Sequence, residues 1–273
     1  MIAQSSLALQ CVGRGIAIHC EDGPTRDVLR ELFDVMWTET ASPQLQYRIA
    51  ATDAGYCLSR SDVGPVGNAR DLGQLLYVLD CDLVIQLQRL RPDLLFLHAA
   101  VLTYEGAAHV LTGRSGAGKS TTCWGLLHRG LGYLSDELAP IRLPDMTVQP
   151  FPRALCMKTA PPPGFELPPG TPATSRGYHV AISHMPASPP PVPSPLQTVF
   201  FVEYDASRRA PTIRAIGSAE AAARLYPNLL NALAHDDAAM AGVTRIATAT
   251  RAFLVEAAEL GATCETILGA LRH

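Results

Sequence analysis

The pattern of apolar and polar residues predicts both strands and helices in the first part of the chain. Residues 1 to about 92 combine short strand-like pieces with two amphipathic helices, predicted near residues 25–36 and 71–90. Asp71 is the expected N-cap of the second helix. The apolar face of that helix consists of Leu72, Leu75, Leu76, Leu79, Leu83, Leu87 and Leu90. The pair Arg91-Pro92 ends it, because proline cannot continue a helix. We therefore expect a smaller N-terminal α+β domain over residues 1–92.

From Asp93 onward the pattern changes to short apolar runs bounded by turn residues, which is typical of buried strands. Strands are predicted at 94–97, 107–111, 198–204 and 253–255. Ser218 is expected to cap a helix that carries Leu225, Leu229, Leu230 and Leu233, and a terminal helix is expected after the last strand. Strands that alternate with helices indicate an α/β domain over residues 93–273.

Prolines dominate the middle of this second region. Most of the 22 prolines lie between residues 140 and 211, so loops around a few short strands are predicted there. Two roles are open for the segment 161–195: a lid that folds over a peptide substrate and a mobile connector.

Charge and composition exclude several classes of partner and of protein. The formal net charge is −3, which provides no basic field for a nucleic acid or an anionic membrane surface, and neither is expected as a partner. Seven scattered cysteines without a C-x-x-C pair argue against a disulfide framework and against a zinc site. The first residues lack the basic start and apolar stretch of a signal peptide, and no apolar run approaches membrane-spanning length. We expect a cytoplasmic, globular protein.

The segment from Gly113 to Ser120 fits the pattern G-x-x-x-x-G-K-[ST], after an apolar strand and before a helical run. In such a loop the glycines turn backbone N–H groups toward phosphates, the lysine neutralises the β- and γ-oxygens, and the hydroxyl ligates Mg²⁺. The alternative is an incidental glycine turn. The expected residues for ATP are Gly113, Arg114, Ser115, Gly116, Ala117, Gly118, Lys119, Ser120 and Thr121.

Two adjacent acids follow the P-loop. Asp136 and Glu137 end a short predicted strand that starts at Gly132, and we expect this strand to lie beside the one that leads into the loop. Phosphoryl transfer needs an acid to hold Mg²⁺, and transfer to an alcohol benefits from a carboxylate that accepts the hydroxyl proton. The two acids could divide these tasks between them. Alternatively, they cap the next turn.

His98 is the other candidate for chemistry. It stands at the end of the predicted strand that precedes the P-loop strand, inside an apolar stretch where a histidine needs a polar partner. A hydrogen-bonded core histidine would satisfy that need as well as a catalytic one.

Together these motifs resemble a known family. Leu97-His98-Ala99-Ala100, the P-loop, Arg129-Gly130 and Leu134-Ser135-Asp136-Glu137 have the order and spacing of the catalytic domain of HPr kinase and its relatives. The chain is similar to the shorter HPr-kinase-like proteins that modify peptides, including those encoded with lasso peptides. The close resemblance covers about residues 94 to 143.

The resemblance implies an ATP- and Mg²⁺-dependent serine kinase with the P-loop fold shared with phosphoenolpyruvate carboxykinase. It implies that His98 lies against the acidic pair and that one acid is the base while the other serves the metal. The longer side chain of Glu137 suits the metal, which leaves Asp136 as the preferred base. Arg153 and Lys158 resemble a basic segment of these relatives, with a role at the phosphoryl group or substrate, although solvated surface is the alternative. Assembly into a homo-oligomer is a further implication.

Some features depart from the family. Members of the family typically have glycine after the histidine and two aspartates in the acidic pair, whereas this chain has Ala99 and Glu137 at these positions. The glycine-rich second signature of true HPr kinases is also missing, which argues against the reverse dephosphorylation and against HPr as the substrate.

Four functions are consistent with these motifs. The first is a kinase that phosphorylates a serine of a peptide or small protein, with the N-terminal domain as the natural place to hold it. A small-molecule kinase of the adenylylsulfate type has a similar loop and acid but does not require His98. A nucleotide-switched ATPase is an alternative from another class, although the Ser-Gly-Gly-Gln signature of transport ATPases is missing. A noncatalytic nucleotide sensor is the last alternative, and the intact Lys119, Ser120 and Asp136 argue against it.

Overall fold

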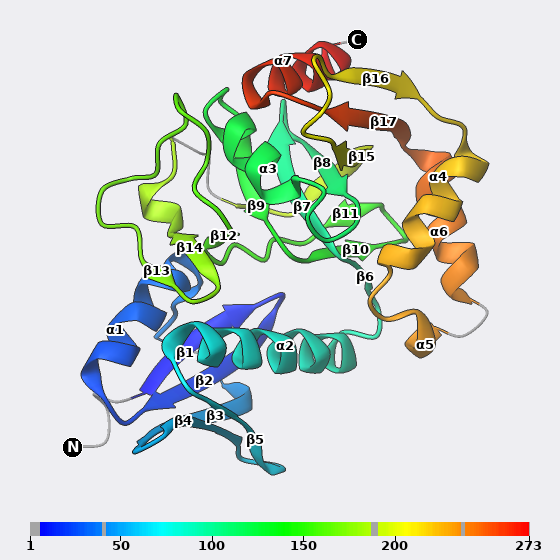
Figure 1. Ribbon diagram of the computed structural model, residues 1–273. Helices are drawn as coiled ribbons and strands as arrows, with labels where there is room; N and C mark the ends of the chain where they lie inside the picture. Colours follow the sequence, from blue (N-terminus) through cyan, green and yellow to red (C-terminus); the bar gives the residue numbers. More distant parts are fainter. Residues whose placement is uncertain (1–5, 40–41, 187–190, 236–237, 273) are drawn as a thin grey trace. The chain divides into compact units, whose positions relative to one another are not determined.

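The computed structural model describes residues 6–39, 42–186, 191–235 and 238–272 (Figure 1). The chain forms two compact units. The first comprises residues 1–91 with two later segments, 152–160 and 167–184, and the second comprises residues 92–151, 161–166 and 185–273. The predicted α/β class is confirmed, because strands and helices interleave throughout the second unit. No helix in the described ranges combines the length and apolar character that a bilayer crossing requires.

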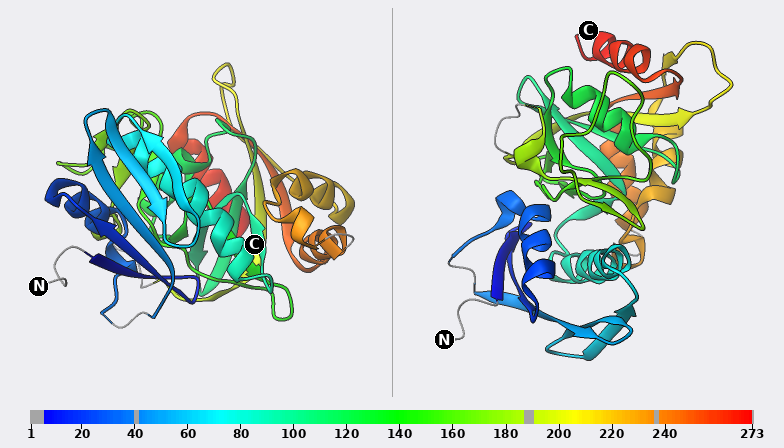
Figure 2. Two further views of the ribbon diagram at one scale, coloured as in Figure 1. Left: turned by 90° about the horizontal axis from the view of Figure 1, so that it is seen from below. Right: turned by 60° about the vertical axis from the view of Figure 1, so that its left-hand side comes forward.

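The first unit contains a five-stranded sheet. Its strands lie in the order β1 (Ser6–Cys11), β2 (Arg14–Cys20), β3 (Pro43–Thr52), β4 (Gly55–Arg60) and β5 (Gly64–Ala69). The pair β2/β3 is parallel and the other pairs are antiparallel. On β3, Leu45, Tyr47 and Ile49 are buried while the residues between them are exposed, so only one face of the sheet is covered. Helices α1 and α2 cover that face (Figure 2).

The two helices of this unit test the predicted ones directly. Helix α2 (Leu72–Leu90) confirms the leucine pattern, and the Asp71 carboxylate accepts the N–H of Gln74 at 2.8 Å, as an N-cap does. Helix α1 (Gly23–Leu32) is shorter than predicted, because the chain tightens into a 3₁₀ turn, η1 (Asp34–Met36), after Phe33.

The proline-rich stretch forms loops around three short strands, as predicted. These strands are β12 (Leu155–Met157), β13 (Ala173–Thr174) and β14 (Gly177–Val180), in the order β12-β14-β13. The Ser175 hydroxyl donates to Asp71 at 2.7 Å, and the Ala154 N–H donates to the carbonyl of Leu32 at 2.8 Å. These bonds fasten residues 152–160 and 167–184 to the first unit. The choice between lid and connector stays a prediction, and residues 187–190 of that segment lie outside the described ranges.

A nine-stranded sheet forms the centre of the second unit. Its main path runs in the order β6-β10-β11-β15-β8-β7-β9, with β17 added to β15 and β16 added to β17. The strands are β6 (Leu95–Leu97), β7 (Ala99–Tyr104), β8 (Ala107–Thr112), β9 (Gly132–Ser135), β10 (Ala139–Arg142), β11 (Thr147–Val148), β15 (Ser194–Tyr204), β16 (Thr212–Ala215) and β17 (Arg251–Ala257). Strands β8, β15 and β17 are mutually parallel neighbours, so their C-terminal ends share one edge.

Helices cover both faces of this sheet (Figure 1). Helices α4 (Ser218–Leu225) and α6 (Ala238–Ala249) pack on one face, where Phe201 joins a buried apolar cluster with Leu225 and Val243. Helices α3 (Lys119–Leu127) and α7 (Leu260–Leu271) pack against each other, and α7 lies on β17. Gly125 permits their close approach, since a Cβ at that position would lie 2.6 Å from the sulfur of Cys264.

Three sequence predictions in this unit are wrong, and one strand was not predicted. Strand β9, which leads to the acidic pair, pairs with β7 and not with the P-loop strand β8. Strand β7 was missed in the sequence, and it turns back into β8 through a hairpin at Glu105-Gly106, both with positive φ. The helix after Ser218, α4, ends at Leu225 because Pro227 follows. A 3₁₀ turn, η3 (Tyr226–Asn228), comes next, and Leu233 lies in a separate short helix, α5 (Ala232–His235). Ser218 is also not the cap, since Gly217 occupies that position.

Buried His109 on β8 gives the stability of the second unit a defined pH dependence. The side chain is 2% exposed, and burial lowers its pKa from 6.5 to about 4. Between these values the unfolded chain binds the proton and the folded chain does not. The free energy of unfolding therefore has its full contribution from neutral His109 above pH 6.5, and this contribution is lost as the pH falls toward about 4.

Between about pH 7 and about pH 5, His109 should lower the free energy of unfolding of the second unit by about 2 kcal/mol. We therefore expect His109→Gln to remove this part of the pH dependence. The measurement is urea unfolding followed by fluorescence of Trp124, which lies buried in this unit, in a Trp37→Phe background. An identical pH dependence with and without His109 would contradict the prediction.

Candidate nucleotide site

The loop between β8 and α3 has the backbone of a phosphate-binding turn. Gly113, Gly116 and Gly118 have φ values of 152°, 82° and 88°, which side chains rarely adopt. Gly113 is required for a second reason, because a Cβ there would lie 2.5 Å from the carbonyl oxygen of Val202 on β15. The strand, the glycine-rich turn and the helix N-terminus predicted from the sequence are therefore present.

Lys119 is the first residue of α3 and is only 8% exposed. Its ammonium donates to the carbonyl of Gly113 at 2.9 Å and to that of Arg114 at 3.3 Å. The cation is thus held inside the turn of its own loop, beside the N–H groups that begin the helix. This concentration of positive charge and donors fits an anion such as the β- and γ-phosphates of a nucleotide. Arg114 and Ser115 are exposed on the same loop, and Thr121 follows in α3.

Ser120 and Asp136 bring two oxygen donors together. The Ser120 hydroxyl donates to a carboxylate oxygen of Asp136 at 3.2 Å, and Asp136 is 1% exposed. Hard oxygen ligands of this kind suit Mg²⁺, which takes one or two protein ligands and completes its shell with phosphates and water. Within the part of the chain that the structure describes, no group of three or more histidines, cysteines or acids could bind a metal by itself. The residues therefore fit Mg²⁺ held jointly with a nucleotide.

Glu137 meets a different partner. One of its carboxylate oxygens lies 3.0 Å from Nε2 of His98, and the two side chains are 39% and 32% exposed. The adjacent acids thus have different partners: Asp136 contacts the P-loop serine and Glu137 contacts the histidine. The contact of His98 with the acidic pair, expected from the resemblance, is present.

His98 is held at a break between two strands. β6 pairs with β10 and β7 pairs with β8 and β9, so the chain changes partners at His98. The N–H of His98 donates to the carbonyl of Asn228 at 2.8 Å, and its carbonyl accepts the Thr112 hydroxyl at 3.2 Å. Because Thr112 directly precedes Gly113, this second bond ties His98 to the start of the P-loop.

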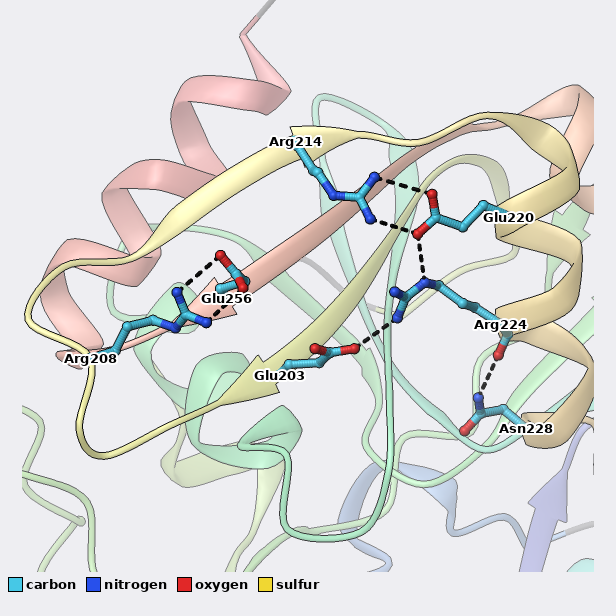
Figure 3. A network of polar contacts seen from close by, with 7 residues as sticks. All are labelled: Glu203, Arg208, Arg214, Glu220, Arg224, Asn228 and Glu256. Carbon is cyan, nitrogen blue, oxygen red and sulfur yellow. Dashed lines mark hydrogen bonds and ion pairs between the residues drawn. The ribbon is translucent and has the colours of Figure 1, made fainter.

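Asn228 belongs to a polar network that sequence reasoning missed (Figure 3). Its amide donates to the carbonyl of Arg224 at 2.9 Å, and the Arg224 guanidinium contacts Glu203 at 2.7 Å and Glu220 at 3.0 Å. Glu203 lies near the end of β15, so the network links the support of His98 to a central strand. Thr112 had a sequence signal, as a polar residue closing an apolar strand before the P-loop. Asn228 had no sequence signal, because it is far from His98 in the sequence.

The remaining two predicted residues lie in the first unit. The Arg153 guanidinium contacts the Asp80 carboxylate of α2 at 2.5 Å, and its side chain is 11% exposed. Lys158 follows β12. A role for either residue at the phosphoryl group or the substrate stays a prediction.

Comparison with known proteins finds a likeness of fold among solved structures. The chain matches no protein-family model and no curated protein. Among solved structures, the HPr(Ser) kinase/phosphatase from Coxiella burnetii aligns over 65% of this chain and 95% of its own, with 13% identity and a TM-score of 0.36. A likeness of this degree carries no argument about activity, which must come from the residues of the site.

If the loop binds nucleotide phosphates, Mg-ATP should stabilise the protein. At about 100 times its dissociation constant it should add about 2.7 kcal/mol, which is a melting shift on the order of 5–10 °C. Lys119→Ala should remove most of this shift because it removes the buried ammonium. The measurement is thermal melting with and without Mg-ATP.

Arg142→Ala is the matched control, because it removes an exposed cation of the same unit that pairs with Asp145, and it should keep the shift. A wild-type protein that shows no shift, or a Lys119→Ala variant with the full one, would rule out the P-loop as the binding site.

Proposed function

We propose that the protein is an ATP-dependent kinase that transfers the γ-phosphoryl group to a serine hydroxyl of a peptide or small protein. The observation that carries the proposal is the pair of adjacent acids with separate partners, Asp136 on Ser120 and Glu137 on His98. A nucleotide-binding module needs the first contact alone. A second carboxylate, partly exposed and paired with a histidine, is what transfer to an alcohol requires in addition.

The geometry favours a particular division of roles. Asp136 is buried against the P-loop serine, where Mg²⁺ would bind with Ser120 and neutralise charge on the phosphate oxygens. Glu137 is 39% exposed, so a substrate hydroxyl can reach it. We therefore assign the base to Glu137 and the metal to Asp136, the reverse of the choice that side-chain length favoured.

The reaction then proceeds as an in-line displacement. Glu137 accepts the proton of the serine hydroxyl, and the serine oxygen forms a bond to the γ-phosphorus as the bond to the β,γ-bridging oxygen breaks. ADP leaves with that oxygen. Lys119 stabilises the charge on the phosphate oxygens, and His98, beside Glu137, orients the carboxylate.

Competing functions differ in the acceptor. An ATPase would deliver the same phosphoryl group to water, and a small-molecule kinase would deliver it to a metabolite. The partly exposed Glu137 can accept a proton from either acceptor, so the product that forms separates the two. A peptide acceptor, a cytoplasmic location and assembly into a homo-oligomer are parts of the proposal that rest on the resemblance to HPr-kinase-like proteins.

The acceptor class is tested with Mg-ATP and a mixture of synthetic peptides, each with one serine at the start, middle or end. We expect a subset of the peptides to gain the mass of one phosphoryl group, with matching release of ADP, as read by mass spectrometry and nucleotide chromatography. Release of inorganic phosphate without any modified peptide would favour the ATPase and contradict the proposal.

The division of roles is tested by two amide substitutions. Glu137→Gln should lower the transfer rate by about 100- to 10,000-fold while Mg-ATP still binds, because it removes only the proton acceptor. Asp136→Asn should instead raise the Mg²⁺ concentration needed for half-maximal transfer, and Asp145→Asn, an exposed acid of the same unit, should change neither quantity. Full activity of Glu137→Gln would refute its role as base.

A further inference from the structure

Strand β15 presents its last residue, Tyr204, on the same face as the P-loop helix. Side chains alternate along a strand, so residues 201 and 203 share one face while residues 202 and 204 share the other. Phe201 packs with α4 and α6, and Glu203 contacts Arg224 of α4. Tyr204 therefore points to the opposite face, which α3 covers.

Tyr204 also lies directly beside the phosphate-binding turn. A Cβ built on Gly118, the residue before Lys119, would be 3.4 Å from Cβ of Tyr204 and 3.9 Å from Cγ of its ring. The Tyr204 side chain is nevertheless 53% exposed. A large aromatic side chain thus stands at the edge of the P-loop with about half of its surface open to a ligand.

The chain directly after Tyr204 is held by polar contacts. Asp205 accepts the N–H and the hydroxyl of Ser207 at 2.9 and 2.7 Å, which forms a tight turn after the strand. Arg208 then forms two bonds with Glu256 of β17, at 3.0 and 2.6 Å (Figure 3). The backbone next to Tyr204 is therefore held in place without a ligand.

Tyr204 and the P-loop occupy the edge at which parallel α/β sheets bind ligands. β8 leads into the P-loop, and β15 runs parallel to it and ends at Tyr204. Ligands of open α/β sheets bind outside the C-terminal ends of such strands. A phosphate chain seated on the loop would place the rest of its nucleotide within reach of the neighbouring strand end.

We propose that Tyr204 is the platform for the adenine base of ATP, which stacks on the exposed face of its ring. This assignment rests on the proposed ATP site. Base stacking on an aromatic ring needs a π-face and no specific hydrogen bond, which Tyr204 supplies beside Gly118.

The test compares two ligands that share the phosphates but not the base. Isothermal titration measures the affinity of wild type, Tyr204→Ala and Tyr204→Phe for Mg-ATP and for Mg-tripolyphosphate. We expect Tyr204→Ala to weaken ATP on the order of tenfold and to leave tripolyphosphate within about twofold, while Tyr204→Phe keeps both affinities. Tyr226→Ala, another exposed tyrosine of this unit, is the control and should change neither.

The outcomes separate this inference from the proposed function. If Tyr204→Ala weakens both ligands equally, the ring supports the loop and does not bind the base. If it weakens neither, Tyr204 does not contact the nucleotide, and in both cases the ATP site stands. A wild-type protein that binds neither ligand would overturn the ATP site and this inference together.

Discussion

The hydrogen bond from the Lys119 ammonium to the carbonyl of Gly113 is the contact on which the site depends. It holds a nearly buried cation at the N-terminus of α3, where the helix dipole is also positive. Loop carbonyls offset part of this charge, and an anion at the same place would offset more. Gly113 makes the arrangement possible by approaching the carbonyl of Val202 too closely for any side chain. A turn of this kind is suited to a phosphate group.

The proposed phosphoryl transfer depends on a second constraint, the different partners of two neighbouring carboxylates. Asp136 and Glu137 follow the end of β9 and reach different partners, so one can serve a metal while the other remains available to a substrate. His98 secures the second acid, and its own backbone is bonded to Thr112 on one side and Asn228 on the other. Through Asn228 and Arg224 the histidine is coupled to the ion-pair network beside β15.

The sequence was most informative where the chemistry is local. The P-loop was predicted from its motif between an apolar strand and a helical run, and the leucine pattern placed a helix near residues 71–90, where α2 lies. Strand β7 after His98 was not predicted, because it continues the apolar stretch of β6 and is distinguished from it by the strands with which it pairs. The Arg153–Asp80 contact, which joins the proline-rich segment to the first unit, depends on residues far apart in sequence. Pro227 is a local stop signal for α4, and the predicted helix, which carried Leu229, Leu230 and Leu233, wrongly continued past it.

The most direct test of the central claim is the affinity of the wild-type protein for AMP, ADP and ATP in the presence of Mg²⁺, measured by titration calorimetry. If the loop and Lys119 grip the terminal phosphates, ADP and ATP should bind at least about tenfold more tightly than AMP, which is about 1.4 kcal/mol. Equal affinities for the three nucleotides would contradict the account, because binding would then come from the nucleoside and not from the P-loop.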